Sequence, residues 1–336
     1  MTADRRRIGV ATVAAAVCLF VSACSASPAP TASLESSVVP PASAPTPTAA
    51  ISAFMPTAAA SVASGLIVLG DGVDGGLGLW RFEAPNHWTA LATLPAATGI
   101  ARFGDDLAIS GRASLELRPA GAPATAGTPL PMKWQGPAPT AKIVALDRSP
   151  NGAVAIATAD GESQGYWLVA ADGTLETLQP APTESFTPLV AWLDDTRLLV
   201  LTTDRQQASR LAVVDVAAHT IKPSMDFAGV RVFALSADRR YLAAATGASV
   251  YAGSVEAFLG TGQPATVAAV DSSAVVWGLA FDPSGTQLAW LSGMVAPDGL
   301  VTSVREIGYA KGSESWVEGF DSPAPFGNAM AQVWMP

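Results

Sequence analysis

Cysteine and histidine are almost absent from this chain. Among its 336 residues there are two cysteines, Cys18 and Cys24, and two histidines, His87 and His219. No disulfide is available beyond residue 24, so a folded domain there must be stabilised by the packing of a sizeable core. Zinc sites use His and Cys ligands, and a Ser-His-Asp triad needs a histidine beside its serine. We therefore expect no metal and no cofactor.

Positive charge is also scarce. The chain has 28 acidic and 19 basic residues, a formal net charge of −9, and only 14% charged residues. A negative surface repels nucleic acid and anionic lipid headgroups. The sequence also has no basic patch interleaved with aromatic residues. These features argue against nucleic acid as a partner.

The first residues have the three parts of an export signal. Arginines at positions 5–7 precede an apolar run from Ile8 to Val21, and residues 21–24 read VSAC. A charged, an apolar and a small-residue segment in this order are typical of a secretory signal. The alternative is a membrane-spanning helix. It fits less well, because the run is shorter than the ~20 residues that cross a bilayer.

A cleavage site directly before Cys24 resembles the lipobox of bacterial lipoproteins. In that family the signal, here residues 1–23, is removed, and the cysteine becomes the lipid-bearing N-terminus. The resemblance implies a lipid on Cys24 and a location at the extracytoplasmic face of the cell membrane. Lipoproteins of this kind carry a diacylglyceryl group, which meets the need for more than one acyl chain in durable anchoring.

Residues 24–61 have the composition of a linker. After Cys24 they are mostly Ala, Ser, Thr and Pro, with hardly a charge. This composition offers too little apolar surface to form a core, and its prolines favour a semi-extended chain. We predict a disordered tether that holds the remaining domain, residues 62–336, away from the membrane.

The pattern of residues in this domain differs from that of the linker. Runs of four to seven apolar and β-branched residues, such as LIVL at 66–69 and LLVL at 198–201, alternate with Gly, Asp, Ser, Pro and Asn. No stretch keeps a 3.6-residue apolar period between helix caps. Short apolar runs bounded by turn residues predict strands, so we expect an all-β fold.

One type of hairpin recurs along the domain. Its copies are spaced by roughly 42–46 residues, as four-stranded propeller blades are, and they lie at residues 101–108, 147–154, 191–198, 234–243 and 280–289. SPNG at 149–152 and FDPSG at 281–285 resemble the SPDG signature of WD40-like repeats in TolB-type propellers. The copies at 193–196 and 236–239 lack the Pro-x-Gly pair. The resemblance implies a β-propeller that acts by binding within envelope complexes.

The first blade lacks its inner strand. The domain begins at Leu66 with the pattern of a second strand, and further strands follow at 77–82 and 88–94. The C-terminal residues 331–336, AQVWMP, resemble the inner strand at 190–193. We predict that they pair with the strand at Leu66 and close a ring of six four-stranded antiparallel blades, because an open edge would leave backbone groups unpaired. Rings of five or seven blades are the alternatives.

Several polar residues fall in loops between the second and third strands of the blades, which lie together on one face of a propeller. The ligand-face candidates are Asp74, Asp160, Glu162, Asp204, Arg205 and Asp298. This acidic rim fits a basic partner or a cation, or it serves solubility alone. The G-x-S-x-G match at 161–165 joins two strands rather than a strand and a helix, which favours a hairpin loop over a nucleophile elbow.

These features favour a monomeric, non-catalytic lipoprotein whose propeller binds a protein or a cell-envelope ligand. One alternative is an extracytoplasmic carbohydrate-active hydrolase or lyase, since paired carboxylates need only be close in space. Another is a sensor whose ligand enters the central channel. The tryptophans suit packing between blades, with carbohydrate stacking as the second interpretation.

Overall fold

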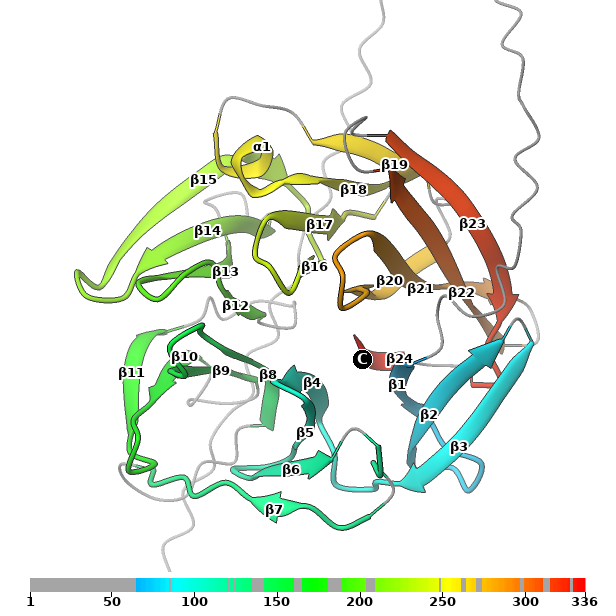
Figure 1. Cartoon of the computed structure of the whole chain (residues 1–336), viewed down its shortest axis with the longest axis horizontal. Coiled ribbons are helices and arrows are strands. Elements are labelled where there is room, and N and C mark those ends of the chain that lie inside the picture. Colours follow the sequence, from blue (N-terminus) through cyan, green and yellow to red (C-terminus); the bar gives the residue numbers. More distant parts are fainter. Residues whose placement is uncertain are drawn as a thin grey trace, which may run out of the picture. The chain divides into compact units, whose positions relative to one another are not determined.

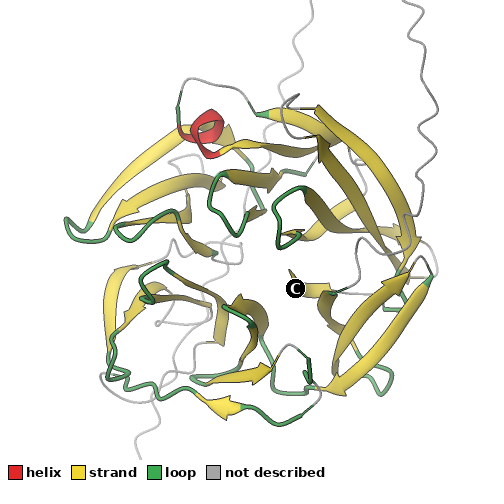
Figure 2. Ribbon diagram, in the orientation of Figure 1, coloured by secondary structure: helices red, strands yellow, loops and turns green. Residues whose placement is uncertain are grey.

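Twenty-four strands of the described residues form six four-stranded antiparallel sheets, arranged as blades around an axis (Figures 1 and 2). The computed structural model describes residues 65–335 except 85, 120, 124, 135–141, 160–164, 181–188, 204–208, 248, 261–263, 270–273, 297–298, 311–314 and 327–328. The six-bladed β-propeller predicted from the sequence is confirmed. The predicted signal peptide, the lipid site at Cys24 and the linker lie outside the described residues.

The first blade is closed by the C-terminal strand. Its strands, from the axis outwards, are β24 (Ala329–Trp334), β1 (Leu66–Asp71), β2 (Leu77–Ala84) and β3 (His87–Thr93). In the antiparallel pair of β24 and β1, Trp334 lies opposite Leu66 and Val333 opposite Ile67. The predicted ring closure is confirmed, and it pairs the inner edge that β1 would otherwise leave open.

Blades two, three and four follow one another around the ring (Figure 1). We name the strands of each blade A to D from the axis outwards. Blade two has β4 (Gly99–Phe103), β5 (Asp106–Ser110), β6 (Leu115–Pro119) and β7 (Thr128–Pro129). Blade three has β8 (Lys142–Arg148), β9 (Val154–Ala159), β10 (Gly165–Val169) and β11 (Leu175–Pro180). Blade four has β12 (Val190–Trp192), β13 (Arg197–Thr203), β14 (Ser209–Asp215) and β15 (Thr220–Ala228).

Blades five and six complete the ring. Blade five has β16 (Val232–Leu235), β17 (Tyr241–Ala245), β18 (Ser249–Ser254) and β19 (Ala265–Ala269). Blade six has β20 (Ala274–Phe281), β21 (Gln287–Ala296), β22 (Gly299–Ala310) and β23 (Ser315–Pro323). The strand-A starts agree closely with the repeat positions in the sequence.

The core lies between the blades. Strand B is apolar along its length because each blade packs both faces against its neighbours. In β1, for example, all residues but the last are buried, as expected for strands covered on both faces. The outer strand β3 is half-exposed. Six apolar clusters of buried residues occur, one at each blade interface.

One short helix, α1 (Val255–Leu259), was not expected from the sequence. It connects β18 and β19 and begins at Ser254, whose side chain accepts a hydrogen bond from the Ala257 N–H. Phe258 is fully buried between blades four and five, so packing of one side chain stabilises the turn. Five residues are too few to show a helical period in the sequence. Within the described residues, no helix has both the length and the apolar character needed to span a membrane.

Candidate functional site in the central channel

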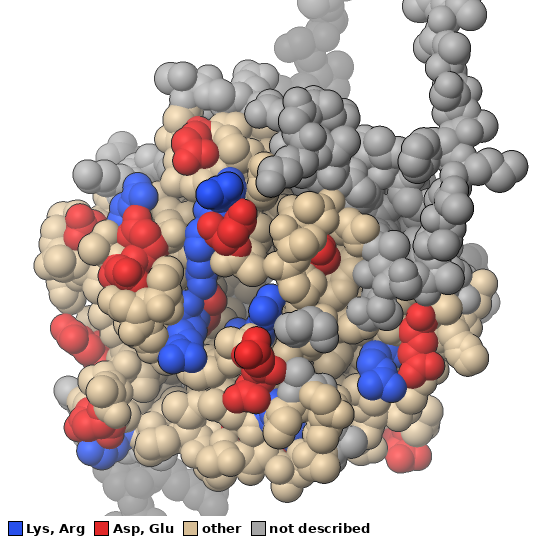
Figure 3. All heavy atoms as spheres, viewed as in Figure 1, with Lys and Arg blue, Asp and Glu red and all other residues tan. Residues whose placement is uncertain are grey.

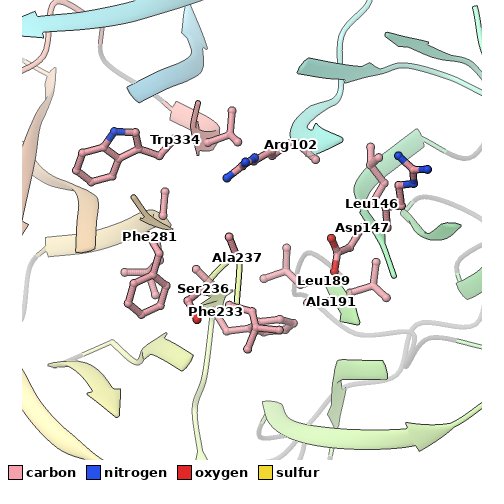
Figure 4. A pocket seen from close by; sticks show the side chains of 18 of the residues that line it. Arg102, Leu146, Asp147, Leu189, Ala191, Phe233, Ser236, Ala237, Phe281 and Trp334 are labelled. Carbon is pink, nitrogen blue, oxygen red and sulfur yellow. The ribbon is translucent and has the colours of Figure 1, made fainter. Parts of the chain in front are cut away.

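The A strands of all six blades enclose a channel of about 570 Å³, whose described lining includes residues of the turns between strands A and B (Figure 4). We call the end of the channel at these turns the A–B mouth. Many lining residues are apolar, but the larger ones are more than nine-tenths buried in the cores between blades: Ile100, Leu146, Phe233, Leu279, Phe281 and Val333. The surface that faces the channel is therefore more polar than apolar. A space of this volume has room for a small molecule or for part of a larger ligand.

Four charged residues lie among the described lining residues of the channel: Arg102, Asp147, Arg148 and Arg239. Arg102 extends from β4 towards the middle of the channel, and Asp147 lies on the wall formed by β8 (Figure 4). Acidic and basic side chains are mixed on the face viewed in Figure 3, and basic side chains are among those nearest the central hollow. The channel lining is thus cationic in a protein with an excess of acids.

Arg239 ties three blades together at the A–B mouth. From blade five, its Nη1 donates to Asp147 Oδ2 of blade three and to the carbonyl oxygen of Trp192 in blade four. Its Nη2 donates to the carbonyl oxygen of Arg148 over 2.6 Å. Asp147 Oδ2 also accepts from the Trp192 N–H over 2.7 Å. The inner edge of β12 faces the channel and pairs with no described strand. The side chains of Arg239 and Asp147 therefore satisfy the carbonyl oxygen and the N–H of Trp192 on this edge.

The backbone of Arg239 is unusual for its residue type. Arg239 has φ 63°, and the corresponding positions of the turns in blades three and six are Gly152, with φ 96°, and Gly285, with φ 72°. This left-handed conformation costs a residue with a Cβ roughly 1–2 kcal/mol. Strain of this kind persists where the surrounding structure compensates it. Here the compensation is the set of hydrogen bonds that the Arg239 guanidinium group makes across the channel mouth.

Arg102 and Arg148 meet at Gly104 of the blade-two turn. Arg102 Nε donates to the Gly104 carbonyl oxygen over 2.9 Å. A Cβ built on Gly104 would lie 3.6 Å from Arg148 Nη1, so the second guanidinium also lies against this residue. The Arg148 guanidinium carbon lies 5.2 Å from the ring centroid of Phe103, a cation–π distance. Both guanidinium groups are thus held near one turn.

The A–B turns carry acids as well, and one of these, Asp194, is engaged within its own turn. In blade four, Asp194 Oδ1 accepts from the N–H groups of Thr196 and Arg197, and its Oδ2 accepts from Arg197 Nε over 2.6 Å. Partial burial raises the pKa of Asp194, but the hydrogen bonds from Thr196 and Arg197 outweigh it, and the net pKa is below the usual value. This carboxylate is used to stabilise its own turn.

The sequence-predicted ligand face lies at the other end of the ring. Asp74 is in the turn between β1 and β2, as expected for a loop between strands B and C. The other candidates, Asp160, Glu162, Asp204, Arg205 and Asp298, lie outside the described residues, as does most of the G-x-S-x-G segment. The channel lining described above includes turns between strands A and B. The sequence-predicted candidates were assigned to loops between strands B and C, which lie at the opposite end of a blade.

The two histidines lie in different blades, and the described tryptophans are buried or half-buried. His87 begins β3 in blade one, and His219 lies in the turn before β15 in blade four, so they belong to different blades. Every tryptophan side chain that the structure describes is buried or half-buried, which fits packing between blades. Among the described residues, no group of three or more His, Cys, Asp or Glu is placed to hold a metal.

The sequence analysis missed the residues that define the channel mouth. Arg102, Asp147 and Arg148 lie in strands or turns that were identified, but their convergence depends on the ring. Arg239 had a signal in the sequence, since it stands where two other copies of the turn have glycine. The sequence analysis notes only that this copy lacks the Pro-x-Gly pair, although a bulky residue at a glycine position indicates a specific contact.

Comparisons with known proteins identify the fold. No family model matches the sequence, and no curated protein matches it either. Among solved structures, TolB from Acinetobacter baumannii superposes with a TM-score of 0.56 at 12% identity, covering 82% of this chain and 67% of the other. A putative TolB from Agrobacterium tumefaciens superposes with a TM-score of 0.53 at 13% identity, covering 79% and 91%. At this identity the likeness concerns architecture alone, and the fold of this chain is that of a TolB-type propeller.

Proposed function

We propose that this chain is a lipid-anchored extracytoplasmic lipoprotein whose propeller binds a protein or a cell-envelope ligand without catalysing a reaction. The observation that carries this proposal is the chemistry of the channel. It combines a space of about 570 Å³ with a few charged groups, among them Arg102, Asp147 and Arg239 at the A–B mouth. This combination suits recognition, because a few placed polar groups orient a ligand.

The carbohydrate-active alternative has less support from the channel. Glycoside cleavage uses two carboxylates on opposite sides of the bond. Among the described lining residues Asp147 is the one carboxylate, and it forms an ion pair with Arg239. Turnover at the channel would need a second acid, which this lining does not supply.

The loops between strands B and C remain part of the proposal as a second contact surface. Asp74 and the candidates at 160, 162, 204, 205 and 298 would offer a mainly acidic rim to a basic partner. Propellers of TolB type, which this chain resembles in fold, are found in envelope complexes, and this association favours a protein or wall component as the ligand.

The anchor is tested first. The protein is expressed in a lipoprotein-processing bacterium fed with labelled palmitate, next to the Cys24→Ser variant. We expect label and partition into detergent for the wild-type protein and neither for the variant. Membrane partition that persists in Cys24→Ser would overturn the lipid anchor without touching the binding proposal.

The binding function is tested by capture. The purified protein is immobilised and exposed to envelope extract, and an acidic protein of similar charge serves as the control surface. We expect one envelope component to be retained by the propeller and not by the control. Release of sugars from wall glycan by the purified protein, with no retained component, would replace the proposal by its carbohydrate-active alternative.

A further inference from the structure

We propose that the channel holds an anion, either a carboxylate or a phosphate, and that Arg102 is its principal anchor. This inference rests on the proposed binding function and names the chemistry of the part of the ligand that enters the ring. It is carried by the Arg102 guanidinium group, which reaches into a channel of about 570 Å³ and lacks a counter-ion among the described residues (Figure 4).

The lining of the channel is basic, whereas the whole chain is acidic. The whole protein has 28 acidic and 19 basic residues, whereas the charged residues of the described lining are three arginines and one aspartate. The aspartate is neutralised, because Asp147 forms an ion pair with Arg239 and accepts a further hydrogen bond from the Trp192 N–H. Arg102 and Arg148 are the two charged residues of the described lining that have no ion pair.

Neither of these two guanidinium groups has a described counter-ion. No carboxylate of the described residues lies within 4.0 Å of Arg102 or Arg148. Arg102 Nε is occupied by the Gly104 carbonyl oxygen, which fixes the direction of the side chain and leaves Nη1 and Nη2 for the channel. Arg148 lies against the same glycine. An anion beside Arg102 would supply the counter-charge that the described residues do not provide.

The guanidinium group suits such an anion in shape as well as in charge. Its planar fork donates two parallel hydrogen bonds to a carboxylate or a phosphate. The rings of Phe233 and Phe281 point away from the channel into the cores between blades (Figure 4). The channel of about 570 Å³ leaves room for the body of a ligand whose anionic head meets Arg102.

The test uses three small probes of one shape class. 3-Phenylpropionate and phenyl phosphate carry the two proposed anions, and 3-phenylpropanamide is the neutral control. Binding to the purified protein is measured by calorimetry or by ligand-observed NMR. We expect the anions to bind at least about tenfold more tightly than the amide, since hydrogen bonds between charged groups contribute about 1.5–3 kcal/mol. The probe that binds more tightly shows whether the channel prefers a carboxylate or a phosphate.

Variants connect the binding to Arg102. Arg102→Gln should weaken the anions by about tenfold and leave the amide unchanged, and Arg102→Lys should retain part of the affinity because the charge is kept. Arg81→Gln is the matched control, since Arg81 is paired with Glu83 on β2 and does not line the channel. Thermal unfolding of each variant verifies folding.

Equal affinity for the anions and the amide, equal affinity of Arg102→Gln and wild type, or no binding of any probe at millimolar concentration would overturn the inference. These outcomes are separable from failure of the proposed function. A protein that retains an envelope component but ignores the anions loses only the inference. A protein that binds the anions through Arg102 but retains no envelope component keeps the channel site and loses the larger ligand.

Discussion

Two regions of the ring are fastened by different means. The seam between blades six and one is apolar: Trp334 and Leu66 pack with Trp80 and Phe326, and Trp88 meets Phe326 edge to face at 5.2 Å. At the A–B mouth, blades three, four and five are joined by charged and polar groups, through the pair of Arg239 and Asp147. Apolar contacts such as those of the seam are favoured in water. The polar contacts of the mouth are weakened by water, because water competes for the same hydrogen-bonding groups.

The difference separates a role in stability from a role in the site. Apolar burial contributes roughly 25 cal/mol for each Å² removed from water, and aromatic pairs add about 0.5–1.5 kcal/mol. The side chains of Arg239 and Asp147 are 20% and 21% exposed, so solvent reduces the worth of their pair towards the ~1 kcal/mol of surface ion pairs. The strained backbone of Arg239 offsets a gain of that size. The net gain in stability from an arginine at this turn is therefore small, and the clearer consequence of Arg239 is that it ties blades three, four and five together at the channel mouth.

The largest effect is expected when the seam is opened. Trp334→Ala removes a buried aromatic side chain from the strand that closes the ring, and it leaves a cavity against Trp80 and Phe326. We expect a loss of about 3–5 kcal/mol in the free energy of unfolding, measured by urea denaturation followed by circular dichroism.

Val73→Ala serves as the control for the seam, because Val73 is 76% exposed and should change stability by less than about 0.5 kcal/mol. If Trp334→Ala unfolds at the same urea concentration as the control, the C-terminal strand does not hold the ring closed, and the contrast between seam and mouth disappears.

A smaller and more informative effect is expected at Arg239. Arg239→Ala keeps the left-handed backbone and loses every hydrogen bond of the guanidinium group, so it should destabilise the fold by about 2 kcal/mol. Arg239→Gly loses the same bonds but relieves the backbone, and it should be more stable than the alanine variant by about 1 kcal/mol. Urea denaturation of both variants, with Asp147→Asn alone and in combination, measures strain and ion pair separately. Alanine and glycine variants of equal stability would mean that the backbone of Arg239 stores no strain.

The same contrast explains which parts of the structure could be predicted from the sequence. Strand patterning and turn residues are local, so the repeats, the blade number and even the pairing of Leu66 with Trp334 follow from them. The tie between Arg239 and Asp147 joins residues 92 positions apart, and its geometry depends on the ring radius and on side-chain rotamers that no local pattern encodes. The glycine position occupied by Arg239 was the available signal. For Arg102 the sequence has no comparable signal, because its neighbours in space come from other blades.

The smallest expected effect is the response to acid, which sharpens the contrast because none of the described residues in the apolar cluster of the seam is titratable. Hydrogen bonds from Thr174 and Lys133 lower the pKa of Asp172 to about 2, from 3.8. Since the folded pKa is the lower one, the stabilisation is complete above pH 3.8 and is lost as the pH falls towards 2. Asp172→Asn should therefore reduce the melting temperature slightly at pH 6 and hardly at all at pH 2, and its curve of melting temperature against pH should be flatter than that of the wild type. A difference between the two proteins that grows on acidification would reverse the assigned direction of the pKa shift. Trp334→Ala should instead lower the melting temperature by a similar amount at both pH values, because burial of an indole ring does not depend on protonation.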